Sequence, residues 1–150
     1  MSSKGNRLSL ADFEPRTVDF EVVSPTSESK VVGIKLLTDT EFDALMKSVP
    51  DPEPPYLFSK NKETGAVKKI PDLDDPGYKA AVAEAGRERT YRLLAAAVDI
   101  PFPGDTFAQK AKSMRETGIP SWLLLKLARA VYSMMGLETA EVEQRAETFR

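Results

Sequence analysis

One segment near the C-terminus, residues 121–135, constrains the fold more than any other part of the chain. On a helical wheel its apolar side chains cover an arc of roughly 220°, whereas a helix on the surface of a globular protein needs only about 100° to face a core. Lys126, Arg129 and Ser133 occupy the remaining arc, with Trp122 beside them at the N-terminal end. Such a helix must be covered on several sides, either by its own chain or by another protein.

These two ways of covering the helix have different functional meanings. If the flanking helices surround it, the helix is the centre of the core and has no functional role. If part of the arc stays open, a second chain can bind there, because ~300 Å² of extra apolar surface at ~25 cal/mol per Å² contributes a gross ~7 kcal/mol before the costs of association. The candidate partner-binding residues are then Trp122, Leu123, Leu125, Leu127, Ala130, Tyr132 and Met134.

The composition argues against most kinds of catalysis. The chain contains no His and no Cys, which excludes Ser-His and Cys-His nucleophiles, disulfides and thiolate metal sites. Asp72, Asp74 and Asp75 lack the loop spacing of a cation site and are better explained as helix caps. The glycines form no phosphate-binding pattern. We therefore expect a protein without enzymatic activity, cofactor or metal.

Charge and hydropathy argue against two further kinds of partner. The net charge is −2, whereas non-specific nucleic-acid binding needs an excess of Lys and Arg. Residues 76–135 carry more bases than acids, which indicates either solvated helix faces or a surface for an acidic partner. No stretch approaches the ~18 apolar residues of a membrane span, and residues 1–6 lack the apolar run of a secretion signal. The expectation is an intracellular protein that binds neither nucleic acid nor membranes.

Turn and proline signals divide the chain into three parts. Residues 1–49 are predicted to form an N-terminal β-hairpin and helix unit, residues 50–73 a Pro-rich linker and exposed loop, and residues 74–150 a helical domain. The predicted fold class is therefore α+β, with a small N-terminal β-hairpin unit and a mainly α-helical C-terminal bundle.

Within the first part, Val18, Phe20 and Val22 alternate with acidic residues, as in a half-buried strand. A second apolar run at residues 31–36 is placed to pair with it. The spacing of Thr38–Glu41 is that of a capping box, which predicts the start of a helix. Because two strands alone are only marginally stable in water, the hairpin needs this helix or a partner chain against it.

The second part begins with Pro50-Asp51-Pro52-Glu53-Pro54-Pro55. This stretch is extended and stiff, because each proline fixes its own φ and restricts the residue before it. It is either a spacer or a ligand for a groove on another protein. Residues 56–71 are predicted to form a loose hairpin or an exposed loop, and we expect this segment to be mobile.

The third part carries the start and stop signals of four helices. An acidic residue followed by Pro76 begins the first, and Asp105 or Thr106 caps the second, which ends at Gly118. The apolar segment 121–135 forms the third helix. The last helix has apolar residues at helical spacing, namely Val142, Ala146 and Phe149.

In combination, these motifs resemble a known family. The acidic proline cluster is followed by Asp74-Asp75-Pro76-Gly77-Tyr78-Lys79-Ala80-Ala81, which opens a helix with an Arg-rich continuation. A Gly-Ile-Pro break and a C-terminal Glu-Thr-Ala-Glu-Val-Glu-Gln-Arg-Ala-Glu-Thr-Phe helix come after it. Over roughly residues 30–150 this order is similar to that of the tail assembly chaperones of long-tailed bacteriophages.

The resemblance implies a small, non-enzymatic protein of the host cell cytoplasm that binds helices of the tape measure protein. Such a chaperone keeps its long client soluble while tail tube subunits polymerise around it, and it is absent from the mature virion. In many family members a ribosomal frameshift yields a longer form that recruits tail tube subunits. The flexible side chains of Met114, Met134 and Met135 suit a reversible holder of helices. Homo-oligomerisation through the same apolar surface is a further expectation.

Two other hypotheses compete with this one. A structural phage tail or neck subunit would have similar composition but would be retained in the virion. A small enzyme or a host-directed regulator would be indicated by tight binding of a metal or a nucleotide.

Overall fold

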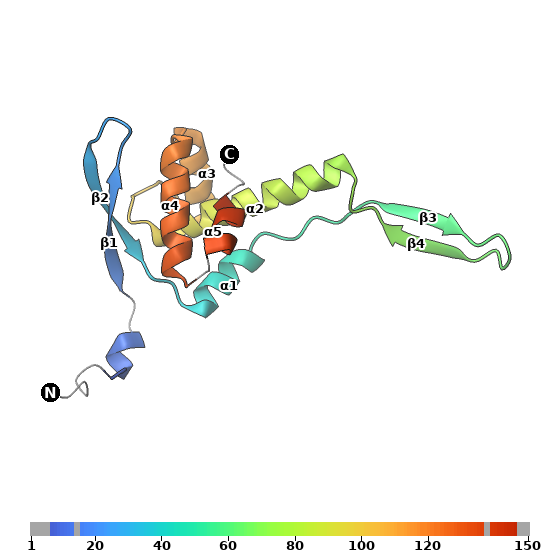
Figure 1. Cartoon of the computed structure of the whole chain (residues 1–150), viewed down its shortest axis with the longest axis horizontal. Coiled ribbons are helices and arrows are strands. Elements are labelled where there is room, and N and C mark those ends of the chain that lie inside the picture. Colours follow the sequence, from blue (N-terminus) through green and yellow to red (C-terminus); the bar gives the residue numbers. More distant parts are fainter. Residues whose placement is uncertain (1–6, 14–15, 137–138, 147–150) are drawn as a thin grey trace.

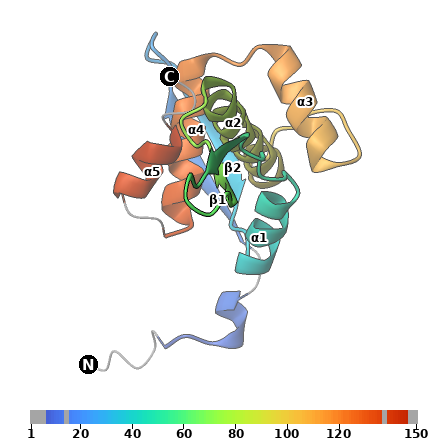
Figure 2. The ribbon, with the colours of Figure 1, turned by 90° about the vertical axis from the view of Figure 1, so that its right-hand side faces the viewer.

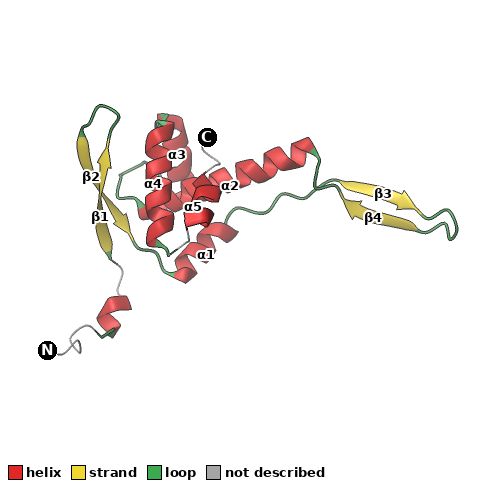
Figure 3. Cartoon of the chain, viewed as in Figure 1, coloured by secondary structure: helices red, strands yellow, loops and turns green. Residues whose placement is uncertain are grey.

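The computed structural model describes residues 7–13, 16–136 and 139–146. Two antiparallel hairpins and a set of helices confirm the predicted α+β class (Figure 3). Phe149, predicted as part of the last helix, lies outside the described residues. Along the chain the elements are η2 (Leu10–Phe13), β1 (Thr17–Val23), β2 (Ser29–Lys35), α1 (Asp39–Lys47), β3 (Tyr56–Lys60), β4 (Val67–Pro71), α2 (Pro76–Ala97), α3 (Phe107–Thr117), α4 (Ser121–Met134) and α5 (Thr139–Ala146).

The elements form a head and an arm (Figure 1). The head contains β1, β2, α1, α3, α4, α5 and the C-terminal half of α2. The arm is the β3–β4 hairpin, residues 56–71, which projects from the head beyond the N-terminal end of α2. The chain exposes 10500 Å², whereas a compact globular monomer of this mass exposes roughly 7600 Å². The chain therefore exposes more surface than a compact monomer of the same mass would.

Local sequence signals explain where the helices begin and end. At α1 the Thr38 hydroxyl accepts a hydrogen bond from the Glu41 N–H at 3.2 Å, while the Glu41 carboxylate accepts one from the Thr38 N–H at 3.3 Å. Thr106 makes the equivalent capping box at α3, and Asp75 caps α2. Helix α3 ends at Gly118, whose φ of 75° lies in the left-handed region that favours glycine.

The β1–β2 hairpin and the helices share one hydrophobic core. An isolated bridge joins Ile34 of β2 to Val98, just beyond α2, and the Asp99 N–H donates to the Gly33 carbonyl at 2.8 Å. Helix α4 packs against β1, α2 and α5. Viewed along the arm, α1, α3 and α5 spread around α2 (Figure 2). The residues assigned by sequence to the hairpin unit and to the helical domain thus meet in the head.

Two arginines of α2 hold the end of α1 and the start of the proline linker. Arg89 donates to the Val49 carbonyl at 2.9 Å and to the Asp51 carboxylate, and Arg92 donates to the Ser48 carbonyl at 3.0 Å. The last carbonyl groups of a helix have no intrahelical donor, so these guanidinium groups satisfy the end of α1 and the start of the proline linker. The two side chains therefore have a structural role within the head.

Candidate protein-binding surface

Helix α4 is mostly covered by its own chain. The exposed fractions of Leu127, Ala130 and Tyr132 are only 2%, 7% and 1%. The prediction that these three side chains lie on an open partner-binding surface is therefore wrong. The reason is that β1, α2 and α5 pack against α4 from different directions, so its wide apolar arc is largely buried within the head.

The hydroxyl of the buried Tyr132 has a hydrogen-bond partner that the sequence pattern does not reveal. The Tyr132 oxygen lies 2.8 Å from Oγ1 of Thr90 on α2, and Thr90 is itself 2% exposed. Thr90 donates its hydroxyl hydrogen to the Gly86 carbonyl at 3.1 Å. Tyr132 is thus the donor between the two hydroxyls, and both buried groups are satisfied.

The other predicted residues of α4, Trp122, Leu123, Leu125 and Met134, are half-buried. Leu125 and Met134 pack against the core. Trp122 and Leu123 line a groove of about 360 Å³ between α4, the β1–β2 hairpin and the segment after α2. We call it the α4 groove. Its lining consists of Val22, Ser24, Glu28, Lys30, Val31, Val32, Asp99, Ile100, Trp122, Leu123 and Leu127.

Trp122 is held at the α4 groove by its neighbour one turn later. Lys126 Nζ lies 5.4 Å from the centroid of the Trp122 ring and donates to the Val23 carbonyl at 2.6 Å. The lysine therefore connects the first turn of α4 to the end of β1 and covers one side of the indole. A half-buried tryptophan in such a position is a common anchor of protein interfaces.

A more exposed apolar surface lies on the arm, which the sequence predicted only as a loose hairpin or an exposed loop. All residues of β3 and β4 are exposed, and the two strands form a separate two-stranded sheet. In its register Tyr56 is opposite Pro71, and Leu57 is opposite Ile70. The exposed large apolar residues of the hairpin are Tyr56, Leu57, Phe58, Val67 and Ile70, and Leu73 follows at its base.

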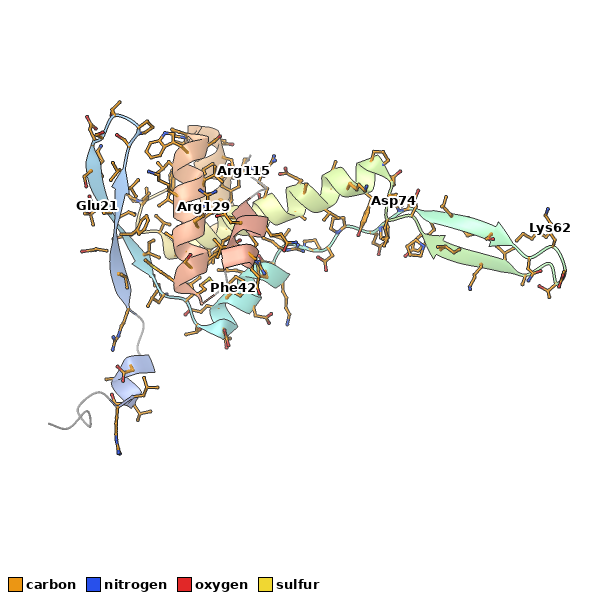
Figure 4. The ribbon with its side chains drawn as sticks, in the orientation of Figure 1. Glu21, Phe42, Lys62, Asp74, Arg115 and Arg129 are labelled. Atoms are coloured by element: carbon orange, nitrogen blue, oxygen red, sulfur yellow. The ribbon has the colours of Figure 1, made fainter. Side chains whose placement is uncertain are left out.

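The arm also has a graded charge. Figure 4 shows Lys62 at its tip and Asp74 at its base. The hairpin carries four lysines and one acidic residue, namely Lys60, Lys62, Lys68, Lys69 and Glu63. The segments at its base carry five acidic residues, namely Asp51, Glu53, Asp72, Asp74 and Asp75. A partner that covers the arm must therefore complement a basic tip, a middle that presents apolar side chains together with Lys68 and Lys69, and an acidic base.

A further arginine of the predicted basic excess is also engaged within the head. Arg115 of α3 lies 2.6 Å from the Glu84 carboxylate and 3.0 Å from that of Glu88, both on α2, and it stacks 4.9 Å from the Tyr91 ring centroid. Burial acts to lower the pKa of Arg115, but the hydrogen bond and charge of Glu84, together with the charges of Glu88 and Tyr91, outweigh it, so the pKa is raised. The pairing joins α3 to α2 and leaves Arg115 charged.

The described residues contain neither a metal-binding cluster nor a membrane-spanning helix. Within residues 7–13, 16–136 and 139–146, no group of three or more acidic side chains is arranged to hold a metal ion. In the same part of the chain, no helix combines the length and the apolar character needed to cross a membrane.

Comparison of the chain with protein-family models, with curated proteins and with solved structures found no match in any of the three.

Proposed function

We propose that this chain is a non-enzymatic tail assembly chaperone that binds helices of the tape measure protein and keeps it soluble during tail assembly. The observation that carries the proposal is the α4 groove, together with the order of motifs over roughly residues 30–150. The lining of the groove is predominantly apolar. Such a surface accepts one face of an amphipathic helix.

The size of the α4 groove fits a reversible holder. A volume of about 360 Å³ accommodates a few side chains that lie one turn apart on a client helix. Ile100 is 37% exposed and Val31 is 66% exposed, and both line the groove together with the half-buried Trp122. Each groove therefore contacts only a small area of the client helix. A small contact area favours release of the client once tube subunits replace the chaperone. The same proposal places the protein in the host cytoplasm and leaves it out of the mature virion. A longer, frameshifted form would recruit the tail tube subunits.

Co-expression with a tape measure protein tests the role of the α4 groove. We expect the wild-type chain to raise the soluble fraction of the client. Trp122→Ala should return that fraction to the level of the client alone, because it removes the aromatic anchor. Phe107→Ala is the matched control, since Phe107 is 45% exposed at the start of α3 and lies outside this groove. Equal client solubility with and without the wild-type chain would contradict the proposal.

Mass spectrometry of purified virions separates the chaperone from a structural tail or neck subunit. A chaperone is absent from mature particles, whereas a structural subunit remains in them at a fixed copy number.

A further inference from the structure

The register of the arm determines which backbone groups point out of the hairpin. Backbone hydrogen bonds join Asp72 to Pro55 at 2.7 Å and Asn61 to Ala66 at 2.8 Å, at the two ends of the ladder. Bonded and non-bonded pairs alternate in an antiparallel ladder, so the odd-numbered residues of β3 bond within the hairpin. The residues whose backbone N–H and C=O groups are directed outward are Tyr56, Phe58 and Lys60 on β3 and Val67, Lys69 and Pro71 on β4.

The two edges of the arm are not equally suited to bind another strand. On β4, Pro71 has no N–H, and antiparallel pairing with a second β4 centred on Lys69 would place two lysines opposite each other. On β3, all three outward-directed residues have an N–H, and Phe58 stands at the centre of the strand. The β3 edge is therefore open, and the β4 edge is protected.

The sequence around β3 is complementary to itself when it is reversed. Glu53 precedes the strand, Phe58 is at its centre, and Lys60 and Lys62 come at its end and just after it, whereas Asp51, further upstream, already pairs with Arg89 of the same chain. In an antiparallel second copy centred on Phe58, Lys62 of each arm lies beside Glu53 of the other, although Glu63 lies opposite that glutamate. Such pairing also converts two strands, which are marginally stable in water, into a sheet of four.

We propose that two copies of this chain pair through β3, antiparallel, across a two-fold axis at Phe58. This register uses every outward-directed residue of β3, because Phe58 faces its symmetry mate and Tyr56 faces Lys60 in both directions. These three side chains lie on the same face, so the two phenylalanines meet at the axis and each lysine approaches a tyrosine ring. The inference goes beyond the proposed function and does not depend on it, because the chain alone suffices to test it.

A matched pair of proline variants tests backbone pairing at the β3 edge. Lys60 and Val67 are opposite each other in the register, and neither uses its N–H within the hairpin. In sedimentation velocity over a concentration series, we expect the wild type and Val67→Pro to form dimers. Lys60→Pro should raise the dissociation constant at least about tenfold, because it removes a hydrogen-bond donor at the interface. Lys60→Ala, which keeps the N–H, should weaken the dimer less than Lys60→Pro.

Cysteine cross-linking tests the register. The chain has no cysteine of its own. In Phe58→Cys the two Cα atoms at the axis would lie about 5.5 Å apart, within the range of a disulfide. Mild oxidation should therefore give a covalent dimer. Lys69→Cys is the control on the same face, since three strand spacings of ~4.8 Å, or about 14 Å, would separate it from its mate.

Three outcomes would overturn the inference. The first is a wild-type chain that stays monomeric at all concentrations. This result is expected if the β3 edge binds an acidic segment of a client and not a second copy of the chain. The second is an equal effect of Lys60→Pro and Val67→Pro on the dissociation constant. The third is a disulfide dimer that forms with Lys69→Cys but not with Phe58→Cys.

Discussion

Trp122 and Tyr132 belong to the same helix and to the same predicted surface, yet their surroundings differ. Trp122 lies half-buried at the α4 groove beside Lys126. Tyr132 is 1% exposed and donates its hydroxyl to Thr90. A helical wheel places Trp122 among the polar residues and Tyr132 at the margin of the apolar arc, and it contains no information about the neighbouring helix. At the scale of the residue, the neighbours of each side chain therefore decide its role. Trp122 is placed to contact a partner, whereas Tyr132 stabilises the fold.

The Tyr132–Thr90 hydrogen bond should contribute measurably to stability. We expect Tyr132→Phe to lower the free energy of unfolding by about 1 kcal/mol, because the substitution removes a buried donor while Thr90 keeps its bond to Gly86. Urea denaturation measures this difference. Tyr56→Phe on the exposed arm serves as the control and should change the free energy of unfolding by less than about 0.5 kcal/mol. Equal effects of the two substitutions would contradict the assigned role.

The capping carboxylate of α1 should make stability depend on pH. The backbone hydrogen bond from Thr38, followed by the side-chain hydrogen bond from Lys35 at 3.2 Å, lowers the pKa of Glu41. The unfolded state then takes up the proton more readily than the folded state. The stabilisation is therefore present above the unfolded pKa of glutamate and is lost as pH falls through the lower, folded pKa.

Glu41→Gln tests this dependence, because glutamine can still complete the capping box. We expect its urea midpoint to fall less steeply than that of the wild type between neutral and acidic pH. Glu63→Gln, in the turn of the arm, should follow the wild-type curve. Parallel curves for the wild type and Glu41→Gln would show that the Glu41 charge does not contribute.

At the scale of the element, the sequence correctly predicted the features that depend on local interactions. The capping box at Thr38, the proline at the start of α2 and Gly118 at the end of α3 involve residues within one helical turn, so the helix ends are as expected. The sequence left open whether Leu127 and Ala130 are covered by the chain itself, because their burial depends on which elements pack against α4. The sequence likewise did not decide whether residues 56–71 form a hairpin or a loop. Only the structure shows that β3 and β4 pair with each other and that no other strand of the described chain joins them.

The arm should be dispensable for folding of the head. We expect replacement of residues 56–71 by a short Gly-Ser turn to leave the thermal midpoint of the head nearly unchanged, because every residue of the two strands is exposed. Differential scanning calorimetry measures the midpoint. A matched replacement of Ser24–Glu28, the turn of the β1–β2 hairpin, should be more damaging, because that hairpin contributes to the core. A large loss of stability on removal of the arm would show that the arm supports the head.

At the scale of the whole molecule, the separation of head and arm should be visible in solution. A compact chain of 150 residues has a radius of gyration of about 15 Å. Small-angle scattering of Lys60→Pro, which we expect to be monomeric, should give a clearly larger radius, and the variant without the arm should approach the compact value. Equal radii for the two variants would mean that the arm folds back onto the head.

The arm projects from one end of the molecule, and the β1–β2 hairpin, which helps to line the α4 groove, lies at the other (Figure 1). A dimer joined through its arms would therefore be bivalent, with its two grooves facing separate stretches of one long helical client. Once the first groove is occupied, the second meets the same client at a high effective concentration, and linkage of this kind raises avidity by roughly 10²–10⁴ when the geometry allows both sites to engage. Two grooves that each bind weakly would then hold firmly a client long enough to reach both, and they would release a shorter client.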